Sequence, residues 1–117
     1  MPRREPWRDE ATVLDILHAA RHAIAFVDGL DEGAFRADPK SQSAALHQLL
    51  IIGEAVKRLS SEFCQAHPEV AWTLIAGMRD RLIHGYDSVD LGQVWRTLAE
   101  DVPNLVAQLE SQEGSTD

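Results

Sequence analysis

Apolar side chains recur with the 3.6-residue period of an α-helix along nearly the whole chain. Stretches near residues 13–27, 39–63, 68–84 and 90–109 each place their aliphatic side chains on one side of a helix. No stretch alternates apolar and polar residues with the period of two expected of a half-buried β-strand. The pattern therefore predicts an all-α fold, an up-and-down bundle of four main helices plus a short connecting helix.

Capping and helix-breaking residues set the expected ends of these helices. Gly29 ends the first helix, and Asp31 caps a short helix that runs through Arg36. The second main helix, from Pro39 or Ser43 to Phe63, has a broad apolar stripe. We therefore expect it in the middle of the bundle or in a dimer interface.

Two prolines and one aspartate define the second half of the chain. Pro68 is suited to the first turn of the third main helix, which ends before Gly85. Asp90 is a good N-cap for the last helix, and Pro103 should kink it, because proline lacks a backbone donor.

A chain of 117 residues makes one domain. We expect a helical bundle over residues 9–110, an N-terminal extension over 1–8 and a disordered tail over 111–117. The single cysteine, Cys64, cannot form an internal disulfide, which fits a reducing compartment. No apolar run reaches the length of a membrane span or a signal peptide, so the expected location is the cytoplasm, without membrane contact.

The net charge of −8, from 11 basic and 19 acidic residues, argues against broad phosphate binding. Residues 9–38 and 97–117 each sum to −5, whereas residues 39–96 are neutral. An anionic ligand should therefore meet the middle of the chain, in a transient encounter rather than a tight nonspecific complex.

The segment Gly77–Tyr86 brings two arginines, a histidine, a carboxylate and the only tyrosine of the chain to the C-terminal end of a helix. His84 would lie at the negative end of the helix dipole, and Asp80 one turn earlier can accept a hydrogen bond from its ring. Both features suit His84 to act as a general acid. On composition alone, an arginine and a histidine at such a position are more often dipole partners on a solvated surface.

Arg79 and His84 are five residues apart, about 140° around an ideal helix, so they do not share a face. The two side chains can converge if the helix end unwinds, or if a second copy supplies the missing group across a twofold axis. We favour the second arrangement, a composite site at a dimer interface.

The motif Arg79-x4-His84-x-Tyr86 resembles the signature of HepT-like ribonuclease toxins in the HEPN superfamily. Further similarities lie at Ile52-Gly53-Glu54-Ala55, Pro68 through Trp72, Val94-Trp95 and Asp101-Val102-Pro103, so that the resemblance covers roughly residues 11–110. It implies a HEPN-like helical homodimer that cleaves RNA without metal or other cofactor. Arg79 and His84 are then the catalytic pair.

The resemblance also implies a role for Tyr86. HepT-like toxins are paired with a minimal nucleotidyltransferase antitoxin that transfers AMP to this tyrosine. The added phosphate and bulk would repel the RNA backbone. The plain alternative is a tyrosine that packs the turn after Gly85.

Two carboxylates are expected to support the site. Glu54 would pair with Arg79 or Arg81 and orient it, or instead bond Lys57 or Arg58 on its own helix. Asp80 would hold His84, although its charge also opposes an incoming phosphate.

Three further interpretations of the sequence concern a basic patch, a metal site and a function other than RNA cleavage. Lys57, Arg58, Arg81 and Arg96 could form a local basic patch. Asp15, His18 and His22 have metal-ligand spacing, but a solvated helix face explains them better. The alternatives to an RNase are a catalytically silent helical module that binds a nucleotide or protein, and a structural subunit of a nucleotidyltransferase complex.

Overall fold

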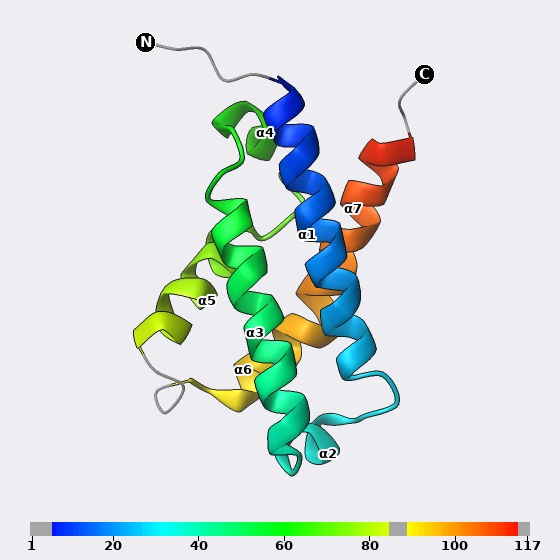
Figure 1. Cartoon of the computed structure of the whole chain (residues 1–117), viewed down its shortest axis with the longest axis vertical. Coiled ribbons are helices and arrows are strands. Elements are labelled where there is room, and N and C mark those ends of the chain that lie inside the picture. The colour runs from blue at the N-terminus through cyan, green and yellow to red at the C-terminus, as the bar shows by residue number, and fades with distance from the viewer. Residues whose placement is uncertain (1–5, 85–88, 115–117) are drawn as a thin grey trace.

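The computed structural model describes residues 6–84 and 89–114, and its elements are all helical (Figure 1). In chain order they are α1 (Pro6–Phe26), α2 (Glu32–Arg36), α3 (Pro39–Val56), α4 (Ser61–Gln65), α5 (Trp72–His84), α6 (Leu91–Arg96), the π-helical segment η2 (Thr97–Asp101) and α7 (Val102–Gly114). The described residues contain no strand, which confirms the predicted all-α class.

Helices α1 and α3 lie side by side in the centre of the molecule and run in opposite directions (Figure 1). Helix α5 packs against α3, and α7 packs against α1. The four main helical segments thus form the expected up-and-down bundle, with α2 at one end and α4 at the other. The largest fully buried side chains are Phe35, Ile16, Leu17, Ile52, Leu98, Leu105, Leu109, Val94, Val102 and Thr97.

The second main helix is shorter than predicted, because α3 ends at Val56 rather than at Phe63. Ser60 begins a separate helix, since its hydroxyl accepts a hydrogen bond from Phe63 N at 3.1 Å. The Asp9 carboxylate of α1 accepts bonds from both Ser60 N (3.0 Å) and Ser60 Oγ (2.7 Å). This long-range anchor stabilises the break between α3 and α4.

The third main helix begins at Trp72, so Pro68 lies in the preceding turn and not in the helix as expected. In that turn, Val70 N donates to His67 O at 3.2 Å. The Trp72 indole closes the turn by donating to Cys64 O at 3.1 Å and His67 O at 2.9 Å.

The last main helix is interrupted where Pro103 was expected to kink it. Asp90 caps α6 by accepting from Gly92 N (2.9 Å) and Gln93 N (3.3 Å), as predicted. The π-helical turn η2 ends two residues before Pro103. Proline lacks an N–H and its ring crowds the carbonyl four residues earlier, which a π-bulge relieves.

Both ends of the helical region extend past the expected limits. α1 already begins at Pro6, and α7 continues through Gly114, beyond the predicted end at Glu110. Within the described residues, no helix is both long and apolar enough to cross a membrane.

Candidate active site

Arg79 lies at a close approach between α5 and α3. A Cβ atom on Gly53 would lie 2.2 Å from Arg79 Cβ, 3.0 Å from Arg79 Cγ and 3.2 Å from the Ile75 carbonyl oxygen. Only a residue without a side chain allows this approach. Gly53 therefore positions the stem of Arg79 against the backbone of α3.

The Arg79 guanidinium is held by two carboxylates. Its Nη2 lies 3.7 Å from Glu54 Oε1, and its Nη1 donates to Asp80 Oδ1 at 3.1 Å. Glu54 thus contacts one of the two arginines expected for it. The Nε atom is buried and has no hydrogen-bond partner among the described residues, which is costly for a charged group. With 26% of its side chain exposed, Arg79 still reaches solvent.

Asp80 forms bonds to its neighbour Arg79 and to Lys57, the C-cap residue that directly follows α3. Its Oδ1 accepts from Lys57 Nζ at 2.6 Å as well as from Arg79. These two cations hold the pKa of the Asp80 carboxyl below its ordinary value, and the hydrogen bond from Lys57 has the larger effect. Among the described residues Asp80 makes no bond to His84, so the expected hydrogen bond between them is wrong. An ammonium at 2.6 Å is the stronger competitor for the carboxylate.

His84 is the last residue of α5 and is exposed. Because α5 is helical through His84, the two motif residues stay about 140° apart around the helix and about 7.5 Å apart along its axis. One protomer therefore does not bring Arg79 and His84 together on one face. Gly85 and Tyr86 lie outside the described residues.

The four residues proposed for a basic patch contact different parts of the molecule. Lys57 pairs with Asp80, and Arg58 lies 3.7 Å from Asp15 of α1. Arg81 Nη1 donates to Gln93 Oε1 at 3.3 Å, which links α5 to α6.

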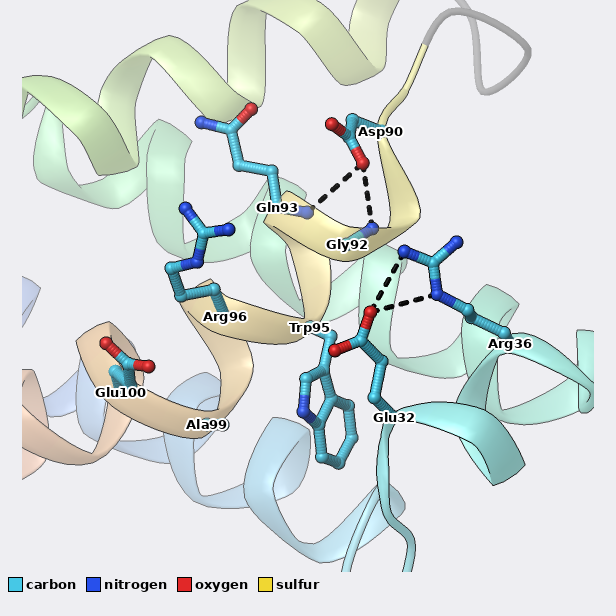
Figure 2. Close-up of a pocket in the computed structure, with 9 residues that line it drawn as sticks. All are labelled: Glu32, Arg36, Asp90, Gly92, Gln93, Trp95, Arg96, Ala99 and Glu100. Carbon is cyan, nitrogen blue, oxygen red and sulfur yellow. Dashed lines mark hydrogen bonds and ion pairs between the residues drawn. The ribbon is translucent and has the colours of Figure 1, made fainter.

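A polar pocket of about 390 Å³ adjoins this link, between α2 and the α6–η2 segment (Figure 2). Arg96 and Gln93 line it together with the Glu32–Arg36 ion pair, whose closest atoms are 2.9 Å apart. The carboxylates of Asp90 and Glu100 also line the pocket, which with Glu32 makes three. It is therefore not a strongly basic surface.

The histidines of α1 lie on an exposed face, and their ring centroids are 6.4 Å apart. His18, His22 and Asp15 line a shallow groove with Ile51, Gln48 and Arg58. In the part of the chain that the structure describes, no group of three or more His, Cys, Asp or Glu could hold a metal ion.

Two features of this site did not follow from sequence reasoning. Gly53 was noted only as part of a motif, although a glycine inside an apolar helical stretch is itself a signal of close backbone approach. The Lys57–Asp80 pair joins residues on different helices, so no local spacing predicts it.

The comparisons with known proteins show which family this helical bundle belongs to. The family model described as "Ribonuclease HepT-like" matches residues 16–111. "Probable ribonuclease HepT" of Thermococcus cleftensis is 38% identical over 102 residues, covering 87% of each chain. "Putative RNase TTE0752" of Caldanaerobacter subterraneus subsp. tengcongensis is 42% identical over 94 residues, covering 80% of this chain and 84% of the relative. No solved structure matches significantly.

The fold and these matches thus define a HEPN-like helical bundle of the ribonuclease class. The chain belongs to the HepT-like ribonuclease family.

Proposed function

We propose that this chain is the toxin of a toxin–antitoxin system, a metal-independent endoribonuclease that acts on RNA in the cytoplasm as a homodimer. Arg79 of one subunit and His84 of the partner subunit act on the same phosphate. The observation that carries the proposal is their separation on α5, which stays helical through His84. Ile83 beside His84 is 53% exposed, which leaves an apolar side chain available for contact between subunits.

The reaction suited to these groups is internal transesterification. The ribose 2′-oxygen attacks the adjacent phosphorus, the new P–O2′ bond forms and the P–O5′ bond breaks. His84 takes the proton of the 2′-hydroxyl and returns it to the departing 5′-oxygen, while Arg79 neutralises charge on the phosphoryl oxygens. The products are a 2′,3′-cyclic phosphate and a 5′-hydroxyl end.

A mixed dimer tests the shared site. We expect the Arg79→Ala and His84→Ala homodimers each to lose activity by about 10²-fold or more. A heterodimer of the two, isolated with different tags, should regain a large share of activity, because one site then has both an intact Arg79 and an intact His84. Activity is measured on a fluorescent RNA.

A heterodimer of two differently tagged Arg79→Ala chains is the control and should stay inactive. If the mixed dimer is as inactive as its parents, while all variants remain dimeric, the two groups do not act across the interface.

The antitoxin half of the proposal concerns Tyr86. We propose that a minimal nucleotidyltransferase transfers AMP to its hydroxyl, and that the added charge beside the site repels RNA. After co-expression with the enzyme encoded by the neighbouring gene, the intact mass of this chain should rise by one or more adenylyl units. Tyr86→Phe, which lacks only the acceptor oxygen, should keep its mass. An unchanged wild-type mass, or an equal gain on the Phe variant, contradicts this role.

A further inference from the structure

One carboxylate oxygen lies between two cations beside the catalytic motif. Asp80 Oδ1 is 2.6 Å from Lys57 Nζ and 3.1 Å from Arg79 Nη1. The exposed fractions of the Lys57, Asp80 and Arg79 side chains are 41%, 51% and 26%. The cluster therefore lies at the surface, where an incoming ligand can reach it.

Lys57 is the C-cap residue of α3, one helical turn after Gly53, the glycine that receives Arg79. Lys57 N donates to Gly53 O at 3.3 Å, so the two residues are one helical turn apart. The contact that brings Arg79 against α3 thereby also brings the Lys57 ammonium to the site. Its position follows from the packing of α3 on α5.

A phosphoryl oxygen and a carboxylate oxygen are equivalent acceptors for such a pair of donors. Both accept short, charge-assisted hydrogen bonds from ammonium and guanidinium groups. A site that holds a carboxylate oxygen between Lys57 and Arg79 therefore has the donors that a phosphodiester needs. Asp80 is exposed and joined to the backbone by a short side chain, so it can turn away to solvent.

We propose that Lys57 is a second phosphate-binding residue of the RNase site, and that Asp80 occupies the place of the RNA phosphate between Lys57 and Arg79 until substrate binds. This inference rests on the proposed function. In this role, Lys57 binds the same phosphate whose charge Arg79 neutralises. It also makes Asp80 an internal competitor that weakens the binding of RNA.

Binding to an RNA that cannot be cleaved separates this role from catalysis. We would measure the Kd of the full chain for a 2′-O-methyl oligonucleotide by fluorescence anisotropy over a range of salt concentrations. Lys57→Ala should raise the Kd about tenfold. Its loss should also reduce the slope of log Kd against log salt by about 0.7, the loss of one phosphate contact. Lys57→Arg should keep most of the affinity.

Lys40→Ala is the matched control, because Lys40 is an exposed lysine in the first turn of the same helix. It should leave both the Kd and the slope unchanged. A Lys57→Ala variant that binds like the wild type overturns the role of Lys57, and so does a tenfold loss of affinity with an unchanged salt slope.

Asp80→Asn tests whether Asp80 competes with the RNA phosphate for Lys57 and Arg79. It keeps the size of the side chain and removes its charge, so we expect the Kd to fall about threefold. Affinity that is unchanged or weaker overturns the role of Asp80. Arg79→Ala separates the proposed function from this inference. If Arg79→Ala cleaves RNA normally, the proposed function fails. If Arg79→Ala is inactive and Lys57→Ala binds RNA normally, only this inference fails.

Discussion

Arg79→Ala should lower kcat/KM for RNA by about 10²-fold or more. The guanidinium is the group proposed to stabilise negative charge on the phosphoryl oxygens, and alanine removes it. Its position is defined by α3, through Gly53 and Glu54. The measurement is a steady-state cleavage assay with purified protein in excess EDTA, where the wild type should stay active.

Arg36→Ala is the matched control for that loss, because Arg36 is an exposed arginine of α2 that is likewise held in an ion pair, with Glu32. The Arg79→Ala protein should remain folded. Since Nε is buried without a partner, we expect its free energy of unfolding to change by no more than about 1–2 kcal/mol.

Several results would contradict this account of Arg79. Wild-type activity that disappears in EDTA points to metal chemistry, and full activity of Arg79→Ala removes the residue from the site. A growth assay tests the alternative function, a catalytically silent binding module. If the chain is an RNase, expression of the wild type should be toxic and expression of Arg79→Ala harmless. A wild type that is itself harmless and binds RNA without cutting it supports the module instead.

The helical class and the bundle could be predicted because each main helix buries one continuous stripe. The break after Val56 could not, since Leu59 and Phe63 continue the apolar period of α3 across it. A hydrogen bond from Ser60 to Asp9, 51 residues earlier in the chain, anchors the segment that follows the break. Local periodicity carries no information about such a partner.

The same limit applies to the candidate site. The motif names Arg79 and His84, and their angular separation follows from helix geometry alone. The partner of Asp80 did not follow, because an i, i+4 contact with His84 competes with Lys57 of another helix. Which one forms depends on how far α5 is shifted along α3, and that is determined by the contact at Gly53.

Gly53→Ala should therefore destabilise the protein and inactivate it together. In an ordinary helix interior, alanine is more stable than glycine by about 0.5–1 kcal/mol. Here the new methyl group would lie 2.2 Å from Arg79 Cβ and 3.2 Å from the Ile75 carbonyl oxygen. Neither atom can rotate away, since one is fixed to the backbone of α5 and the other is part of it. The two helices must separate, at a cost of about 1–3 kcal/mol.

Separation of α3 and α5 would also move the guanidinium relative to the phosphate. A displacement of about 1 Å at a catalytic group can lower the rate by about 10²-fold. Chemical denaturation and the cleavage assay measure the two effects on the same preparation. Gly77→Ala on α5 is the matched control, because its new Cβ would meet nothing closer than Arg81 Nη2 at 3.9 Å. That variant should gain about 0.5–1 kcal/mol and keep its activity. If Gly53→Ala gains stability as Gly77→Ala does, α3 and α5 do not pack as closely as this site requires.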